Sequence, residues 1–352
     1  MTDVSYSGVR SGLVRLLCEE LKSLLDFLPR EGRAEKSAIH VGFVTYSKVL
    51  CCYNVKSSLA QPQMMVVSDV GDMSVPLLDC FLVNVNESRA VITSLLDQIP
   101  ETFADTRETE TVFAPVIQAG MEALKAAECA GKLFLFHTSL PIAEVPGKLK
   151  NRDDRKLINT DKEEALLQPQ TGAYQTLAKE CVAQGCCVDL FLFPNQYVEV
   201  AVLSVIPQLS GGSVYKYACF QVENDQEWFL SGLGQNVQVI GFDAVKRVLT
   251  STGIRAVDFF GAFYLSNTKD VELVGLDGDK TVTVELSMTI GSMKTVEPSC
   301  SVPCSTPAAQ GSDGSASTTW PSPAASSWLI CTETVRLTRS STTWPSLHTG
   351  GS

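Results

Sequence analysis

Apolar and polar positions follow helical spacing at the start of the chain and strand spacing soon afterwards. Apolar residues recur every three or four positions over 9–28, which predicts an amphipathic helix that ends before Pro29. Residues 38–46 and 49–55 have the pattern of strands, and the two residues between them predict a β-hairpin. A further short strand is expected over 64–68.

The middle of the chain alternates helices with strongly apolar strands. The expected helices lie at 86–99, 111–129, 173–184 and 225–248, and the expected strands at 132–137, 188–193 and 214–219. Apolar strands that each follow a helix are typical of a parallel sheet covered on both faces. The pattern therefore predicts a doubly wound α/β domain over residues 1–250.

The pattern changes in the next stretch of the chain. Three segments, 255–265, 271–274 and 281–286, alternate as antiparallel strands do, and Asp277-Gly278 has the composition of a tight hairpin turn. We therefore assign residues 251–286 to a second unit, an incomplete antiparallel β-sandwich.

The last part of the chain has a different character. It is rich in Ser, Thr and Pro, and the letters Thr-Thr-Trp-Pro-Ser occur at 318–322 and again at 342–346. A segment without a periodic apolar pattern buries too little apolar surface to fold. We expect residues 287–352 to be a disordered tail, and a low-complexity linker is one explanation for it.

Composition narrows the class of protein. A net charge of −11 has the wrong sign for a nucleic-acid binder. No run of about 18 apolar residues occurs, so no transmembrane helix is expected. The first residues lack the basic and apolar pattern of a secretory signal, which predicts a cytoplasmic protein whose twelve cysteines are free thiols.

One short motif has the form of a metal site. Asp3-x-Ser5-x-Ser7 fits the metal-binding signature of von Willebrand A-type domains, which lies just before the first helix of that fold. Such a site binds Mg²⁺ through oxygen ligands from three loops. Thr109 or Thr111 is suited to the second loop.

The third loop does not fit this chemistry. The strand at 132–137 is followed by Thr138-Ser139, where the site would need an aspartate. We therefore predict that Asp3, Ser5 and Ser7 hold no metal, and that Asp3 and Ser5 cap the following helix. A metal-dependent binding module remains the alternative.

Motifs for catalysis are missing from the sequence. Neither a Gly-x-Ser-x-Gly elbow nor a His-Glu-x-x-His motif occurs. Cys300 and Cys304 have no second pair of zinc ligands, and 275–280 is better explained as a hairpin turn than as a phosphate loop. The charged run at 151–162 is expected to be a solvated loop, with partner binding as the alternative. We predict that the chain is not an enzyme.

Several long segments resemble one family closely. The chain is similar to the cargo-adaptor subunit of the COPII inner vesicle coat, the Sec-twenty-four family, and within it to the C-type branch. The segments that carry this resemblance include VGFVTYSKVL at 41–50, YNVKSSLAQPQMMVVSDV at 53–70, the apolar stretches at 81–100 and 110–141, GAYQTLAKECVAQGCCVDLFLFPNQYVEV at 172–200 and STGIRAVDFFGAFYLSNT at 251–268.

The resemblance implies a von Willebrand A-like trunk domain, followed by the start of a β-sandwich. It also implies a non-enzymatic role in cargo selection and ER-to-Golgi transport, on the cytoplasmic side of the endoplasmic reticulum membrane. The implied partners are the GTPase-activating subunit of the coat, which the trunk contacts, and export cargo that includes SNARE proteins. The residues that bind cargo or partner are not assigned.

The sequence departs from the family in ways that affect these expectations. The zinc finger that precedes the trunk in the family is not in this chain, so no cofactor is expected, and the first strand is expected to be clipped at Met1. Read with an offset of one base, the tail can encode family-like residues in three places, so we interpret 287–352 as a frame-shifted tail. A non-functional truncated product is therefore another alternative.

Overall fold

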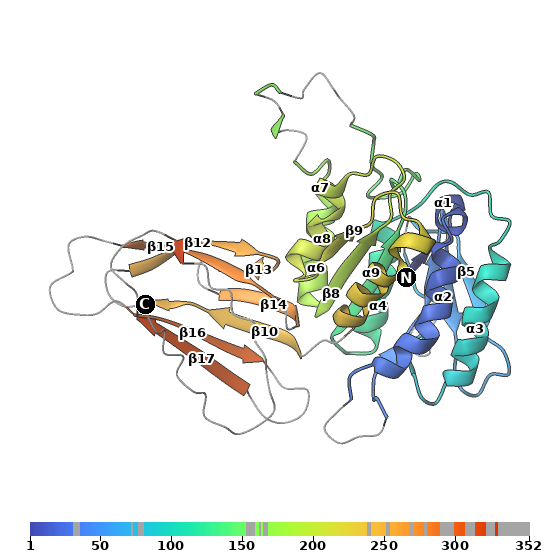
Figure 1. Ribbon diagram of the computed structural model, residues 1–352, viewed down its shortest axis with the longest axis horizontal. Helices are drawn as coiled ribbons and strands as arrows, with labels where there is room; N and C mark the ends of the chain where they lie inside the picture. The colour runs from blue at the N-terminus through green and yellow to red at the C-terminus, as the bar shows by residue number, and fades with distance from the viewer. Residues whose placement is uncertain are drawn as a thin grey trace.

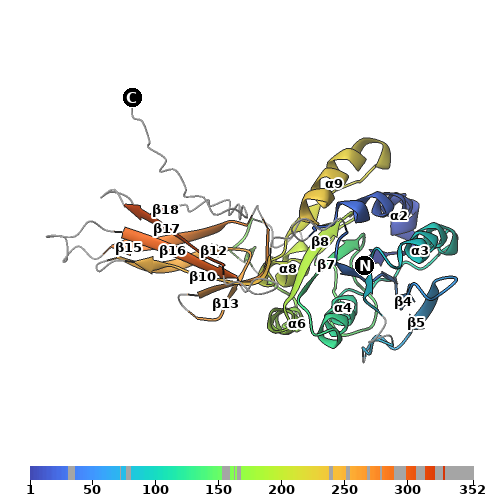
Figure 2. The same ribbon diagram turned by 90° about the horizontal axis from the view of Figure 1, so that it is seen from below.

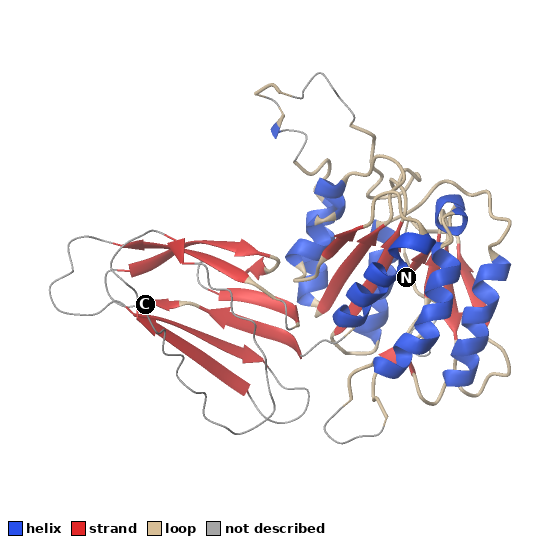
Figure 3. Cartoon of the chain, in the orientation of Figure 1, coloured by secondary structure: helices blue, strands red, loops and turns tan. Residues whose placement is uncertain are grey.

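Seven strands form a mixed sheet at the centre of the first part of the chain (Figures 1 and 3). The structure, a computed structural model, describes residues 1–329 apart from 31–35, 72, 77–80, 153–158, 162, 165–167, 238–240, 251–253, 268–269, 278–279, 289–298, 307–313 and 322–327. The order across the sheet is β5-β4-β3-β1-β7-β8-β9. These strands are β1 (Thr2–Asp3), β3 (Val44–Tyr46), β4 (Leu50–Asn54), β5 (Gln63–Val67), β7 (Gly131–His137), β8 (Cys186–Leu192) and β9 (Val214–Lys216).

Helices cover both faces of this sheet, as the apolar strands predicted (Figure 2). One face carries α2 (Leu13–Leu24), α3 (Arg89–Thr102) and α9 (Val222–Asn236), and the other carries α4 (Ala114–Ala126), α6 (Ala173–Ala183) and α8 (Val205–Leu209). Short helices α1 (Tyr6–Arg10), η1 (Leu25–Phe27) and α7 (Val200–Leu203) and a small sheet of β2 (His40–Val41) and β6 (Val83–Asn84) complete this part. The parallel pairing of β7 with β8 confirms the doubly wound prediction.

The first helix is broken, which the prediction of one continuous helix over 9–28 did not foresee. Gly12 separates α1 from α2 and has a φ of 78°, in the left-handed region. A residue with a Cβ adopts this region at a cost, whereas glycine does not. The helical spacing of apolar residues continues across the break because both helices pack on the same core.

The central strand β1 has only two residues, but it is paired with a neighbouring strand on each side. β1 lies parallel to both β3 and β7, and Thr2 pairs with Thr45 on one side and Phe136 on the other. The amide of Phe136 donates to the carbonyl of Met1 at 3.0 Å. The amino group of Met1 donates to the carbonyl of Phe134 at 2.9 Å, so Met1 lies within the sheet between β3 and β7.

The predicted helix at 225–248 is wrong in its second half. Helix α9 ends at Asn236, and residues Gly241–Arg247 form strand β10. In β10 the inward positions include Lys246, which is 6% exposed, while Val245 is 38% exposed. In this strand a charged residue, Lys246, points inward and an apolar residue, Val245, points outward. The alternation of apolar and polar residues that would have predicted a strand is therefore absent at these two positions.

Two small antiparallel sheets follow the trunk. One contains β10, β11 (Leu249–Thr250), β13 (Tyr264–Leu265) and β14 (Asp270–Leu276), and the other contains β12 (Ile254–Gly261) and β15 (Val282–Met288). Strands β14 and β15 belong to different sheets. The prediction of a hairpin turn at Asp277-Gly278 is therefore wrong, because this connection crosses from one sheet to the other.

The tail contains strands in the parts that the structure describes. Strand β16 (Ser299–Thr306) pairs with β10, β11 and β17 (Gly314–Pro321), and β18 (Trp328–Leu329) pairs with β15. The prediction of disorder is wrong for these three segments, because each adds to an open edge of a β-sheet. The rest of the predicted disorder lies outside the described residues, except for the end of β15.

Candidate functional site

The predicted metal motif lies where β1 ends, and Asp3 is fully buried there. Its Oδ1 accepts the amide of Ser5 at 2.8 Å. Its Oδ2 accepts both the amide of Thr138 at 3.1 Å and the hydroxyl of Thr138 at 2.5 Å. The fold thus brings the first loop and the third loop together, and the protein itself uses both carboxylate oxygens.

The remaining residues of the motif are only partly brought together. Thr111 is buried, and its hydroxyl lies 3.1 Å from the Ser139 hydroxyl, whereas Thr109 is exposed. Ser7 lies within α1 and is partly buried. Ser5 occupies the N-cap position of α1, but no side chain bonds to the helix there, so the capping prediction is wrong. The Ser5 hydroxyl is buried and makes no hydrogen bond with the described residues.

Tyr46 and His137 fill the space beside Asp3, and no pattern in the sequence pointed to Tyr46. The Tyr46 hydroxyl donates to the carbonyl of Phe136 at 2.8 Å and lies 3.0 Å from Nδ1 of His137. Burial lowers the pKa of His137, and burial together with the charge of Asp3 raises the pKa of Tyr46 well above its usual value. The ring of Phe113 packs on His137 with centroids 5.2 Å apart, so the pocket beside the carboxylate holds neutral rings.

This donor set does not fit a Mg²⁺ ion. Mg²⁺ requires near-octahedral oxygen coordination and is usually bound by one or two carboxylates with waters. Here the one carboxylate, from Asp3, already accepts three hydrogen bonds, and the third loop supplies Thr138 in place of an aspartate. Nor do the described residues contain any group of three or more His, Cys, Asp or Glu side chains suited to a metal. Our prediction that the motif is non-functional stays a prediction, and the geometry supports it.

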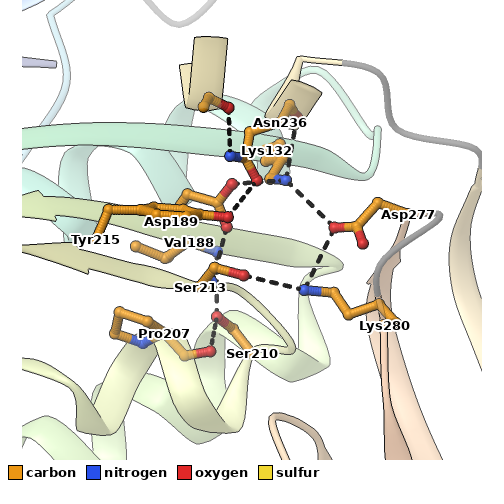
Figure 4. A network of polar contacts seen from close by, with 11 residues as sticks. Lys132, Val188, Asp189, Pro207, Ser210, Ser213, Tyr215, Asn236, Asp277 and Lys280 are labelled. Atoms are coloured by element: carbon orange, nitrogen blue, oxygen red, sulfur yellow. Dashed lines mark hydrogen bonds and ion pairs between the residues drawn. The ribbon is translucent and has the colours of Figure 1, made fainter. Parts of the chain in front are cut away.

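A second polar cluster lies at the opposite end of the parallel strands (Figure 4). Lys132 of β7 reaches Asp189 of β8, with Nζ 2.6 Å from Oδ2, and the two side chains are 5% and 0% exposed. Lys132 also donates to the carbonyl of Asn236 at 3.3 Å and lies 3.9 Å from the carboxylate of Asp277. Burial is the largest single influence and lowers the pKa of Lys132, but the nearby groups, Asp189 first among them and Asp277 as well, together raise this pKa above its usual value.

The cluster connects the trunk to the strands that follow it. Lys280 lies 3.4 Å from Asp277 and 3.5 Å from the hydroxyl of Ser213. The amide of Ser213 donates to Oδ1 of Asp189 at 2.9 Å. Two lysines and two aspartates therefore balance one another between β7, β8 and the connection after β14. We call Lys132, Asp189, Asp277 and Lys280 the charge cluster.

The sequence offered one signal for this cluster, which the prediction did not use. Lys132 and Asp189 are opposite charges in two otherwise apolar strands that were both predicted to be buried. Buried charges require partners. No pattern indicated that Asp277 and Lys280 would join them, since 275–280 was interpreted as a hairpin turn.

Comparison with known proteins places the chain in a family. The family model described as the Sec23/Sec24 trunk domain matches residues 1–237. The chain belongs to this family. The match ends just after α9 and includes every strand of the seven-stranded sheet. Within the described residues, no helix is long and apolar enough to cross a membrane.

Relatives resemble this chain over most of its length. Human protein transport protein Sec24C is 87% identical over 286 residues, which cover 81% of this chain and 26% of that protein. Human Sec24D is 64% identical over 286 residues, 81% of this chain and 28% of that protein. SEC24 A from Arabidopsis thaliana is 36% identical over 290 residues, 82% of this chain and 27% of that protein. The chain spans about a quarter of the length of these curated relatives.

Solved structures agree with this assignment. The crystal structure of the human COPII-coat protein Sec24c superposes with a TM-score of 0.87 at 77% identity, and the match covers 91% of this chain and 42% of that one. A von Willebrand factor type A protein from Catenulispora acidiphila has a TM-score of 0.52 at 10% identity, over 90% of this chain and 64% of that one. The second likeness shows the fold alone, and it confirms the von Willebrand A-like architecture.

Proposed function

We propose that this chain is the trunk portion of a Sec24C-type COPII coat subunit, with a structural and not an enzymatic role in ER-to-Golgi transport. The observation that carries the proposal is the 87% identity with human Sec24C over 286 residues. Identity at this level extends over the interior and the surface of the trunk together. A shared surface is what a coat subunit needs, because its function depends on contacts with other proteins.

The proposed partner is the GTPase-activating subunit of the same coat, bound through the trunk domain. The proposed location is the cytoplasm, peripheral to the endoplasmic reticulum membrane and to vesicles that leave it. Export cargo, including SNARE proteins, would be bound by the complete coat subunit. Cargo sites in other domains are not assigned to this chain, which covers 26% of the human Sec24C sequence.

We also propose a revised domain division. The trunk was predicted to end at residue 250, but β10 pairs with β14 in a sheet outside the trunk. The family match ends at residue 237, directly after α9. The trunk is therefore assigned to 1–237 and the β-sandwich segment to 241–288, with the tail after it.

Binding to the coat partner tests the proposed function. The full chain is mixed with the recombinant GTPase-activating COPII subunit and passed over a size-exclusion column. We expect the two proteins to elute together in a complex. The von Willebrand factor type A protein from Catenulispora acidiphila, which has the same fold at 10% identity, serves as the negative control.

Folding is measured on the same sample, so that the outcomes can be distinguished. A chain that shows the circular dichroism of a folded α/β protein yet elutes apart from the partner contradicts the proposal. An insoluble or unfolded chain instead supports the alternative of a non-functional truncated product.

A further inference from the structure

The two edges of the seven-stranded sheet differ in how they end. Strand β9 forms one edge and has three residues, the last of which is the exposed Lys216. Strand β5 forms the other edge, at the margin of the trunk in Figures 1 and 2, and has five residues, Gln63–Val67. Proteins usually protect sheet edges with short strands, charges or proline. Strand β9 has two of these protections, and β5 has none within its span.

The hydrogen bonds of β4 show which backbone groups of β5 point outward. The amide of Tyr53 donates to the carbonyl of Phe43, so the backbone of Tyr53 faces β3. Backbone groups alternate in direction along a strand, and therefore Cys52 faces β5, where it pairs with Met65. The neighbours of Met65 must then face away from β4.

Met64 and Val66 are those outward residues. Their amides and carbonyls point away from the sheet, and no backbone hydrogen bond joins them to another described segment. Their side chains are also exposed, at 47% for Met64 and 54% for Val66. Backbone donors and acceptors that have no partner among the described residues thus coincide with two exposed apolar side chains along one edge.

The intervening residues hold this edge in a fixed register. The side chains of Met65 and Val67 pack against the trunk core on the face of the sheet that carries α4. A slip of one residue would move them to the other face, so the register is strongly specified. The edge is therefore presented as a rigid template of donors and acceptors.

We propose that β5 is a docking edge at which an extended segment of a partner protein adds as an eighth strand. Backbone complementarity selects this occupant, because only an extended chain satisfies alternating amides and carbonyls in a row. The partner segment carries uncharged, β-branched or apolar residues at alternate positions, which pack over Met64 and Val66. This inference goes beyond the proposed function and does not depend on it.

A neutral extended peptide tests the edge directly. The probe is a capped and uncharged seven-residue peptide, Ser-Thr-Val-Thr-Val-Thr-Ser, added at millimolar concentration to the full chain. Amide hydrogen exchange is followed residue by residue by NMR. We expect exchange at Met64 and Val66 to slow by about tenfold, while Met65 and Val67, already bonded to β4, change little.

Two variants at Val66 distinguish peptide binding at the β5 edge from non-specific peptide binding. Val66→Lys places a charge on the edge and should abolish the protection by the peptide. Val66→Thr keeps the β-branched shape and should retain it. Thermal melting of both variants checks that the trunk remains folded.

Three outcomes overturn the proposal. The first is slow exchange at Met64 and Val66 without peptide, which would mean that the chain covers its own edge. The second is a peptide effect that is absent in the unaltered chain or equal in Val66→Lys. The third is a dimer, seen by sedimentation without peptide and lost in Val66→Lys, which would assign the edge to a second copy of the chain.

Discussion

Lys132 and Asp189 form an ion pair of 2.6 Å between neighbouring parallel strands, at a point where at most 5% of either side chain is exposed. A pair in this setting stabilises the fold less than its short distance suggests, because both charges have lost their hydration. The pair matters more through the destabilisation that follows when only one of its two charges is removed. Removal of one partner leaves the other buried without its nearest opposite charge, and the more distant members of the charge cluster compensate only in part.

Loss of Asp189 alone should therefore cost more than loss of the pair. We expect Asp189→Ala to lower the free energy of unfolding by about 3 to 5 kcal/mol, since Lys132 stays buried. The double variant Lys132→Met with Asp189→Leu should recover most of this loss. Urea denaturation measures both, and a double variant as unstable as Asp189→Ala would contradict the argument.

Asp277 should couple the following strands to the trunk. Asp277→Ala removes the carboxylate between Lys132 and Lys280, and we expect amides of β14 to exchange about tenfold faster. The exposed ion pair of Glu144 with Lys148 provides the control. Glu144→Ala should leave exchange in β14 unchanged, and equal effects of the two variants would refute a specific coupling.

Replacement by alanine should change the stability in opposite directions at two glycines, Gly212 and Gly234. A Cβ on Gly212 would lie 1.8 Å from the carbonyl oxygen of Val188, so the backbone would have to move. We expect Gly212→Ala to cost about 3 kcal/mol or more. A Cβ on Gly234 of α9 would meet nothing within 4 Å, and Gly234→Ala should stabilise the helix by about 1 kcal/mol. Thermal melting of both variants checks the contrast.

The amino group of Met1 should make stability depend on pH. Burial lowers its pKa from 8.0 to about 5. Between these values the unfolded chain binds the extra proton, so stability increases as pH rises through the window and levels off above about pH 8. The slope is at most about 1.4 kcal/mol per pH unit.

An acetylated N-terminus isolates this effect. Acetylation removes the titrating amine, whereas His137, whose pKa burial also lowers, titrates in both chains. Urea denaturation at pH values of about 5.5, 6.5 and 7.5 should give a smaller slope for the acetylated chain. Identical slopes would show that the amine does not titrate between the two pKa values.

Magnesium should not stabilise this protein. The Asp3 carboxylate is already occupied by Ser5 and Thr138, so added Mg²⁺ at about 10 mM should change the Tm by less than about 1 °C. Melting with EDTA in place of Mg²⁺ should give the same curve. A rise in Tm with Mg²⁺ that Asp3→Asn abolishes would instead favour the metal-dependent alternative.

The sequence predicted correctly those helices and strands in which apolar residues follow the regular pattern of that structure. Strands β7 and β8 are apolar at nearly every position because both faces are covered, and they were placed within two residues of their observed ends. Strand β10 was missed because Lys246 points inward and Val245 outward. Strand β1 is too short for any periodic pattern, and its place in the sheet depends on partners far along the chain.

The candidate site was predictable in part for a similar reason. The motif of Asp3, Ser5 and Ser7 is local in sequence, and so is the absence of an aspartate at Thr138. The fit of Tyr46 against His137 depends on the meeting of β3 and β7 through β1, which no local pattern encodes. The contact between Lys132 and Asp277 joins residues of two domains, so no local sequence pattern could predict it either.

The central position of β1 also sets an order of events during synthesis. The amino group of Met1 bonds to Phe134, 133 residues further along the chain, so β1 must wait during synthesis until β7 has been made. At typical rates of translation this delay is on the order of ten seconds. During that time β3 and β4 can form their hairpin, but the middle of the sheet stays open. The nascent trunk is therefore most vulnerable to wrong pairing just before β7 leaves the ribosome.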